Sequence, residues 1–325
     1  MAELEGAAWP KTDAVDAKAD PAAGAMSAPS LTKALVAAPT LAARAPPAVS
    51  TGDSLASTDG IVRRVDEDRW LASRFAQARV RQSLETLYAF SYEVARTAEV
   101  VSDPGLGRIR LAWWRDAVTG GPSGAQGLPA AIKALMEETP LEAGRVVAMI
   151  EARAHDLEAE PFEGWGDLEA YVDATAGAVA HLALQICLAG QAWPLQATNC
   201  ARAVGRAWGF TGLTRASSVW AARRRMFLPQ RLLAHLNLKP EVLFAGGGAH
   251  VIQQARLAML DRARFAFQQA RDLARVMPAA AFPAIGYVAL EPLYRAQLLA
   301  GQEKAPISLL RRQMKLLAAS ALGRF

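Results

Sequence analysis

The sequence has few of the residues from which disulfide scaffolds and metal centres are built. Its 325 residues include two cysteines, Cys187 and Cys200, and four histidines. The cysteines stand in separate apolar segments without CxxC spacing, which predicts buried free thiols in a reducing compartment. The histidines form no HExxH cluster, and no Ser-His-Asp signature is present. A disulfide-rich fold, a zinc site and a serine hydrolase are therefore not expected.

Long apolar runs are also lacking. No window of about 18 uninterrupted apolar residues occurs, so no transmembrane span is expected. Hydrophobic residues nevertheless make up 52% of the chain, and Ala and Leu dominate over β-branched types, which favours helices over sheet. The composition predicts an all-α protein whose folded part is a single domain.

Charge is spread unevenly along the chain. Residues 1–60 contain seven acids and four bases, whereas the whole chain has a net charge of +5, so residues 61–325 have a net charge of +8. This excess suits an anionic partner such as a diphosphate, lipid headgroups or a nucleic acid. We expect no nucleic-acid partner, because the arginines are not interleaved with aromatics as in known binding modules.

The first 60 residues differ in composition from the rest. They are rich in Ala, Pro, Ser, Thr and Gly, and they cannot bury enough surface to offset the entropy of ordering. We predict a disordered tail over 1–60 and a helical domain over 61–325. Acids from Glu3 onward argue against a transit peptide. If Met26 is the true start, the acid-free segment from Leu31 to Pro47 would be transit-like.

The central feature of the folded part is a predicted helix, turn and helix from Leu84 to Val118. Apolar residues recur there at three- and four-residue steps, the period of an amphipathic helix. Asp103-Pro104-Gly105 is expected to end the first helix. Further helices are expected from Val65, on either side of Thr139-Pro140, over 255–276 and at the C-terminus, and a hinge is expected over 278–283.

Two stretches resemble the signatures of the squalene/phytoene synthase family. Residues 87–90 read Leu-Tyr-Ala-Phe, as in the family's first motif. Residues 203–229 match the second signature at Gly205, Ala207, Arg215, Arg225, Phe227, Leu228 and Pro229. A segment between them, with Tyr171, Ala176, Gly177 and Val179, is similar to a third family segment, where the small residues favour close helix packing. The resemblance implies an isoprenoid-synthase-like helical bundle.

The residues that perform the family's chemistry are missing. The Asp-Asp-x-x-Asp of the first motif falls on Ala95, Arg96, Thr97, Ala98 and Glu99. The two aspartates of the second motif fall on Ala216 and Trp220, and its asparagine falls on Gly212. Members of the family use these carboxylates to hold the Mg²⁺ ions that neutralise substrate diphosphates. We therefore expect no metal, no cofactor and no catalysis by the family mechanism.

A branch of the family that includes the mitochondrial assembly factor of respiratory complex I fits better. The segment 89–95 with Glu93, and the segment 108–115 with Arg110, resemble that branch, which also lost its aspartates. The resemblance implies a non-catalytic assembly factor for complex I, or a binder of a prenyl lipid. The alternative is a prenyl transferase of the squalene/phytoene type with an atypical site, which would need Mg²⁺. Expected partners are accordingly a complex I subunit or a prenyl lipid.

The same resemblance implies a remnant of the family's cavity. Its candidate lining residues are Arg81, Tyr92, Glu93, Glu99, Arg110, Trp114, Arg215 and Arg225. Arg81 stands where the family has an arginine that helps to hold a diphosphate; a solvated helix face is the competing interpretation. One of Trp113 and Trp114 should pack in the core. The sequence leaves open whether side chains fill the cavity.

The C-terminal segment 305–325 is a basic amphipathic helix. Ile307, Leu310, Met314 and Leu317 share one stripe beside Arg311, Arg312, Lys315 and Arg324. Such a helix can lie in a membrane interface, or it can dock on the bundle with its bases in water. The expected location is the cytoplasm, or the mitochondrial matrix in a eukaryote. If the helix lies in a membrane interface, the protein is expected to be peripheral on the inner membrane.

Overall fold

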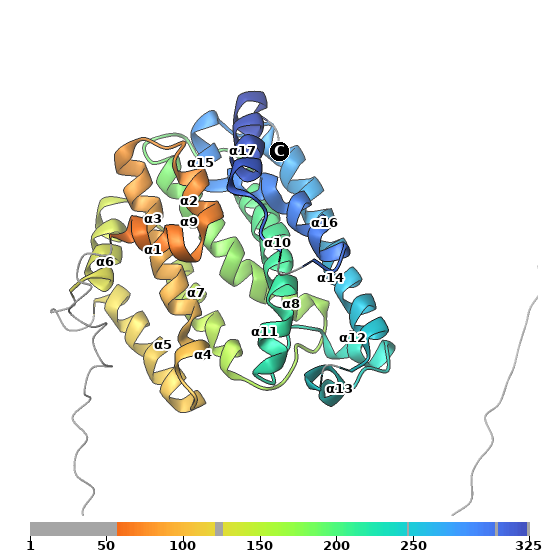
Figure 1. The fold of residues 1–325 in the computed structure, drawn as a ribbon. Helices are drawn as coiled ribbons and strands as arrows, with labels where there is room; N and C mark the ends of the chain where they lie inside the picture. Colours follow the sequence, from red (N-terminus) through yellow and green to blue (C-terminus); the bar gives the residue numbers. More distant parts are fainter. Residues whose placement is uncertain (1–56, 121–125, 246, 303–304, 324–325) are drawn as a thin grey trace, which may run out of the picture. The chain divides into compact units, whose positions relative to one another are not determined.

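A computed structural model of the protein describes residues 57–120, 126–245, 247–302 and 305–323. The chain divides into two units, Met1–Ala45 and Pro46–Phe325, and every described residue belongs to the second. The predicted tail lies outside the described residues as far as residue 56. Within the described ranges all regular structure is helical (Figure 1), which confirms the all-α prediction.

The first half of the chain forms α1 (Thr58–Val65), α2 (Glu67–Ser73), α3 (Ala78–Ala95), α4 (Thr97–Val100), α5 (Pro104–Thr119), α6 (Leu128–Glu138), α7 (Ala143–Ala152), η1 (Arg153–Leu157) and α8 (Trp165–Val172). The second half forms η2 (Asp173–Gly177), α9 (Ala178–Cys187), α10 (Ala197–Arg215), α11 (Ser217–Ala222), α12 (Gln230–His235), α13 (Pro240–Phe244), α14 (Ala249–Ala274), η3 (Ala279–Ala281), α15 (Phe282–Ile285), η4 (Gly286–Leu290), α16 (Glu291–Leu299) and α17 (Leu309–Leu322).

Side-chain caps fix where the first helices begin. The hydroxyl of Ser57 accepts a hydrogen bond from the Gly60 N–H, so α1 begins at Thr58, three residues before the predicted start at Ile61. Asp66 caps α2 in the same way, through the N–H of Arg69. These caps satisfy N–H groups that have no partner inside the helix. A helix start near Asp66 was predicted and is confirmed.

The predicted helix, turn and helix is interrupted earlier than expected. The first helix, α3, ends at Ala95, and only the short α4 separates it from α5. Asp103-Pro104 was predicted to end the preceding helix. Instead it begins the next one, α5. The Asp103 side chain accepts from the N–H of Leu106 at 3.0 Å, and Pro104 fits the first turn because its missing N–H is not needed there.

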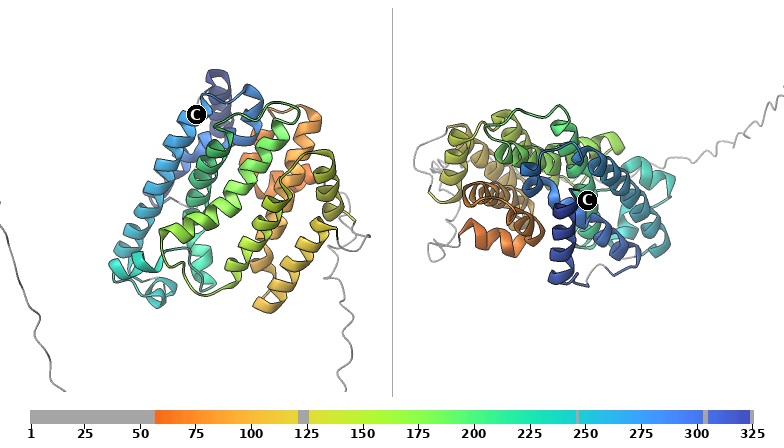
Figure 2. Two further views of the ribbon diagram at one scale, coloured as in Figure 1. Left: turned by 180° about the vertical axis from the view of Figure 1, so that it is seen from behind. Right: turned by 90° about the horizontal axis from the view of Figure 1, so that it is seen from above.

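The predicted apolar face of α3 forms part of the main core. Its residues Leu84, Leu87, Phe90 and Val94 are fully or almost fully buried. Trp114 of α5 packs edge-on against Phe90, with ring centroids 5.4 Å apart. Figure 2 shows the helices of this half from behind and from above.

Two helices cross so closely that only glycine fits between them. A Cβ atom on Gly205 of α10 would lie 2.3 Å from the Cα of Gly177 at the end of η2. Larger side chains would force the backbones apart. The packing role predicted for the small residues around Gly177 is therefore confirmed, and it fixes α10 against the helices η2 and α9.

The segment predicted as a hinge is part of the packed interior. The segment 278–283 runs through η3 into α15, where Ala281, Pro283 and Ala284 are buried. A proline in the first turn of α15 is compatible with a helix start, which explains why Pro283 does not break it.

The last helix docks on the bundle by one face and leaves another exposed. Leu316 and Ala319 of α17 are buried in a cluster with η4 and α16. The opposite stripe, Leu310, Met314 and Leu317, is 67%, 57% and 53% exposed. Ile307, which was predicted to share that stripe, is half-buried instead, and Arg324 lies outside the described residues.

Arg312 makes the main polar contact of α17 with the bundle. It was predicted to be a base exposed to water, and that prediction is wrong. Its guanidinium donates to Asp68 at 2.9 Å and also to Glu67, both in α2. Tyr294 of α16 donates to the other oxygen of Asp68 at 2.5 Å. The predicted docking of the helix on the bundle is therefore confirmed, and its apolar stripe stays exposed. Its predicted place in a membrane interface stays a prediction. No helix of the described chain is long and apolar enough to cross a membrane.

Candidate functional site

The positions of the family's first acidic motif fall on a break between helices. Ala95 is the last residue of α3, Arg96 connects it to α4, and Thr97 begins α4. Carboxylates at i and i+4 lie on one face only when the helix is continuous. The one acid left, Glu99, is exposed. The geometry of a metal-binding pair is lost together with the side chains.

The second motif is broken in the same way. Helix α10 ends at Arg215, Ala216 connects it to α11, and Trp220 packs edge-on against Phe227 at 5.1 Å between ring centroids. Among the described residues no group of three or more His, Cys, Asp or Glu side chains could hold a metal ion. Neither motif therefore offers the oxygen ligands that Mg²⁺ requires.

A charged cluster takes the place of the first motif. Glu93 is 14% exposed and forms ion pairs with Arg96 of the same turn, at 3.0 Å, and with Arg110 of α5, at 3.4 Å. Burial alone would lower the pKa of Arg96, but the hydrogen bond and the charge of Glu93 raise it. The guanidinium of Arg96 also lies over the Tyr92 ring, 5.6 Å from its centroid. Three predicted residues, Tyr92, Glu93 and Arg110, are thus brought together, with their charges already paired.

Arg225, which follows α11, belongs to a second group of charges that also includes a residue of α5. Its guanidinium donates to the backbone carbonyl of Glu158, and the carboxylate of Glu158 pairs with Arg108 at 2.6 Å. Arg108 and Arg110 are two residues apart on α5, so their side chains point to different sides of the helix. Helix α5 thus contacts the first-motif cluster on one side and the anchor of Arg225 on another. We call Glu93, Arg96, Arg110, Glu158 and Arg225 the α5 charge cluster.

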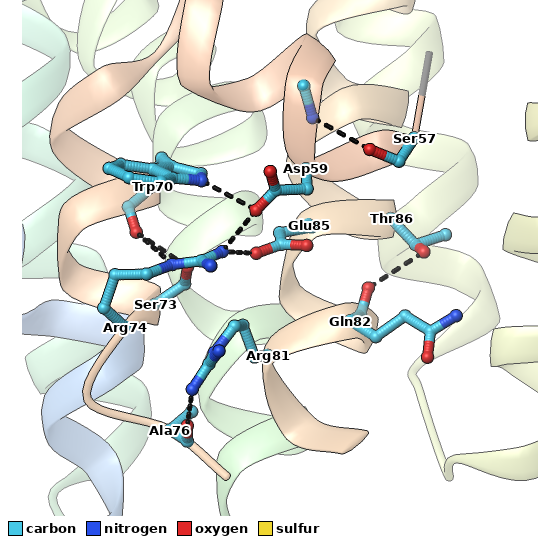
Figure 3. Close-up of polar contacts among 11 residues, drawn as sticks. Ser57, Asp59, Trp70, Ser73, Arg74, Ala76, Arg81, Gln82, Glu85 and Thr86 are labelled. Atoms are coloured by element: carbon cyan, nitrogen blue, oxygen red, sulfur yellow. Dashed lines mark hydrogen bonds and ion pairs between the residues drawn. The ribbon is translucent and has the colours of Figure 1, made fainter. Parts of the chain in front are cut away.

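The other predicted residues lie elsewhere. Arg81, in the first turn of α3, donates to the Ala76 carbonyl at 3.0 Å. Figure 3 shows it beside Arg74, which pairs with Glu85 and with Asp59. Trp114 is 3% exposed and belongs to the core. Arg215 is exposed, and its guanidinium lies 4.0 Å from the ring centroid of Tyr294. These side chains do not converge on one site.

A row of large side chains, which the sequence did not predict, crosses the interior. The guanidinium of Arg69 lies 5.5 Å from the ring centroid of Tyr88 in α3 and 4.9 Å from that of Tyr287 in η4. Trp208 of α10 packs edge-on against Tyr287 at 5.1 Å. The partial negative charge on the faces of the two aromatic rings attracts the guanidinium cation of Arg69. The row links α3 to α10, so side chains fill this part of the interior.

A third buried polar group surrounds Tyr171, one of the residues that resemble the family. Its hydroxyl donates to Asp156 at 2.6 Å, and Arg153 donates to both at 3.2 and 2.9 Å. Burial raises the pKa of Asp156, although Arg153 and Tyr171 act in the opposite direction. The group fastens η1 to α8 and contacts no other predicted site residue.

Both cysteines are buried, free thiols, as predicted. Burial raises the pKa of Cys187 and of Cys200 to about 12. A thiol with so high a pKa is a poor nucleophile at neutral pH, because the thiolate is the reactive form. Neither residue is a candidate for chemistry.

The helical bundle and its two altered motifs define an isoprenoid-synthase-like protein whose metal-binding positions hold other residues. The chain belongs to the squalene/phytoene synthase family, whose profile matches residues 62–313.

Curated relatives have a common name. Mammalian proteins named NADH dehydrogenase (ubiquinone) complex I, assembly factor 6, are similar to this chain. The mouse protein is 25% identical over 227 residues, which cover 69% of this chain and 67% of the relative. The bovine protein is 26% identical over 260 residues, which cover 75% and 77%.

Solved structures support the fold. A dehydrosqualene synthase in complex with a ligand superposes with a TM-score of 0.69 at 17% identity, over 83% of this chain and 96% of that one. The squalene synthase HpnC from Alicyclobacillus acidocaldarius gives a TM-score of 0.59 at 19% identity, over 82% and 92%. The predicted isoprenoid-synthase-like bundle is therefore confirmed.

Proposed function

We propose that this protein is a non-catalytic member of its family that takes part in the assembly of respiratory complex I. The observation that supports it is that both acidic motifs have lost their metal-binding aspartates, in a chain whose curated relatives are named complex I assembly factors. The fold retains the family's framework, whereas the positions for metal ligands hold Ala95, Arg96, Ala216 and Trp220.

The geometry argues against the transferase alternative. A Mg²⁺ ion needs near-octahedral oxygen ligands, several of which come from carboxylates. Of the two carboxylates at the first motif, Glu99 is exposed and Glu93 is engaged by two arginines. Releasing it to a metal would leave two guanidinium groups without their partner, and each is partly buried. These residues therefore do not offer a site for the Mg²⁺ ions that would neutralise a departing diphosphate.

The α5 charge cluster is the working surface that we propose for a complex I subunit. Its charges come from α3, α5 and the segment after η1, so several elements hold it in place. Charge pairs at the edge of an interface mainly set orientation and partner choice. A prenyl lipid in the interior is less favoured, because the row from Tyr88 to Trp208 occupies part of that space.

We further propose that the protein works at the surface of the membrane in which complex I is built, the inner membrane in bacteria or mitochondria. Helix α17 presents an apolar stripe with Arg311 and Lys315 beside it. Apolar side chains and flanking bases together supply the two weak signals that reversible membrane binding needs.

A deletion strain tests the function. We expect NADH:ubiquinone activity and assembled complex I to fall, while squalene, hopanoid and carotenoid contents stay unchanged. Purified protein should release no pyrophosphate from farnesyl diphosphate in Mg²⁺. Arg110→Gln should fail to restore complex I, because it removes the ion pair that joins α5 to Glu93. Arg115→Gln is the matched control, since Arg115 is exposed on the same helix and its one ion pair among the described residues is with its neighbour Asp116.

Normal complex I in the deletion strain together with a missing isoprenoid would overturn the proposal and restore the transferase. Metal-dependent release of pyrophosphate above a protein-free control would do the same.

A further inference from the structure

An apolar pocket lies between α11, α13 and α14. Its volume is about 320 Å³, at the lower end of the range of small-molecule sites. Aromatic, methionine and aliphatic side chains form most of its wall: Trp220, Met226, Phe227, Phe244, Ile252 and Met259. The pocket is therefore suited to an apolar chain.

The end of α10 and the start of α11 form one wall of the pocket. Thr214, Ser217, Ser218 and Ala221 line it. Gly212, which stands at the family's asparagine, is two residues from Thr214 and so points to a nearly opposite side. Trp220 is the exception: the residue that replaces a metal-binding aspartate is part of the apolar wall.

Positive charge gathers at one edge of the pocket. The guanidinium carbon of Arg223 lies 5.9 Å from the Trp220 ring centroid, and that of Arg224 lies 5.4 Å from the Phe244 ring centroid. Both rings line the pocket, and both arginines are exposed. Within the described part of the chain neither arginine forms an ion pair.

The surrounding sequence offers no compensating acid over a long stretch. Between Asp173 and Glu241 the chain contains neither Asp nor Glu. Arg256 of α14 lines the pocket as well. An apolar chamber with cations at its edge is complementary to a molecule with an apolar tail and an anionic head.

We propose that this pocket binds an anionic amphiphile, with its alkyl chain among Trp220, Met226 and Met259 and its carboxylate or phosphate beside Arg223 and Arg224. The pocket lining includes no residue of α17, and Arg225 of the α5 charge cluster directly precedes Met226 of the pocket wall. Binding of an amphiphile is tested on the purified protein and does not depend on the assembly role.

Methionine methyl NMR on the full-length protein tests the site directly. The protein is labelled at the methionine methyl groups and titrated with dodecanoate, then separately with dodecyl phosphate, each below its micelle concentration. We expect saturable shifts of Met226 and Met259, while Met149, buried in α7, stays unchanged. The two titrations distinguish a carboxylate head from a phosphate head. Dodecyltrimethylammonium, with the same chain and the opposite charge, should bind more weakly.

Variants separate the chain site from the head site. Ala221→Phe fills the pocket and should weaken binding about tenfold or more, because a packed wall cannot admit both side chain and ligand. Ala234→Phe, at an exposed position on α12, is its control. The double variant R223Q/R224Q should weaken binding roughly fivefold and reduce its salt dependence. The double variant R264Q/R275Q, at exposed bases of α14, should not.

Two results would overturn the proposal. If Met226 and Met259 do not shift, or if they shift equally in Ala221→Phe while its melting temperature is normal, the pocket does not take the chain. If the ammonium compound binds as tightly as the anions, Arg223 and Arg224 do not recognise a head group. Because the shifts are read at individual methyl groups, a variant that misfolds does not hide the result of the wild-type titration.

Discussion

Two buried aspartates of this protein, Asp156 and Asp68, are each held by one hydroxyl donor and one guanidinium donor. Asp156 accepts from Tyr171 and Arg153, and Asp68 accepts from Tyr294 and Arg312. In each case a tyrosine hydroxyl satisfies one oxygen and an arginine satisfies the other. Donors of both kinds are needed because an ionised carboxylate away from water is costly unless it is fully paired.

Replacement of Tyr171 by phenylalanine tests this arrangement. The variant leaves one oxygen of Asp156 without its 2.6 Å donor in a buried place. Leaving such an acceptor unsatisfied should lower the free energy of unfolding by about 1–3 kcal/mol. The measurement is urea denaturation followed by circular dichroism.

Tyr92→Phe is the matched control for that experiment. Tyr92 is half-buried, and its hydroxyl makes no hydrogen bond within the described residues. Its loss should change stability by less than about 0.5 kcal/mol. Equal effects of the two substitutions would show that the hydroxyl of Tyr171 does not stabilise Asp156.

Helix α17 has one face that docks on the bundle and one apolar face that is exposed. The face with Leu316 and Arg312 holds it to the bundle, which fixes the direction of the exposed stripe. A docked helix does not lose further conformational freedom when it meets a lipid surface. This lowers the entropic cost of binding compared with a free peptide.

Membrane binding through α17 should be abolished by polar substitutions on its stripe. The triple variant L310S/M314S/L317S should reduce sedimentation with anionic vesicles more than tenfold. Partial burial of each of these side chains in the bilayer contributes about 1 kcal/mol to the free energy of binding. Higher salt should weaken binding of the wild type.

Three serines on another exposed apolar face provide the control. Val100, Leu106 and Ile109 of α4 and α5 are 45%, 57% and 66% exposed. If V100S/L106S/I109S loses vesicle binding and the α17 variant retains it, the membrane surface is on α5 instead.

Local signals in the sequence predicted most helices but misplaced some of their ends. The period of α3 and the start of α2 are readable because caps and apolar spacing are local. The role of Asp103 was misassigned, since Asp-Pro-Gly fits a helix end as well as a cap followed by a proline in the first turn. The break at Arg96 leaves no mark in propensity, because Ala95, Arg96 and Ala98 are all good helix formers.

For the whole molecule, the predicted tail should be dispensable for folding. A variant that lacks residues 1–56 keeps Ser57, the cap of α1, and loses no residue of the described core. Its melting temperature should lie within about 2 °C of the full-length value, a shift well below 1 kcal/mol.

Removal of ten further residues is the matched comparison. A variant that begins at Glu67 lacks α1, with the fully buried Val62, and Asp59, which accepts from the Trp70 indole at 2.9 Å. It should melt clearly lower. A large loss of stability on removing residues 1–56 alone would show that the tail docks.

The family and its framework were predictable from sequence, whereas the site was predictable only in part. Two motifs in the right order revealed the bundle even after their acids had gone. The resemblance identified Glu93 and Arg110 as candidate site residues, but it did not predict the ion pair between them. The row through Arg69, Tyr88 and Tyr287 was not predicted either, because no spacing rule relates residues that meet only when α2, α3 and η4 are folded together.

The contact between Arg312 and Asp68 joins residues 244 positions apart, which has a consequence for a chain as it leaves the ribosome. At about 5–20 residues per second, Arg312 is made roughly 12–50 s after Asp68. During that interval α2 is present with two acids, Glu67 and Asp68, that still lack their arginine. The contact that holds α2 to α17 therefore forms after translation of the intervening helices, and until then these two acids depend on water for their hydrogen bonds.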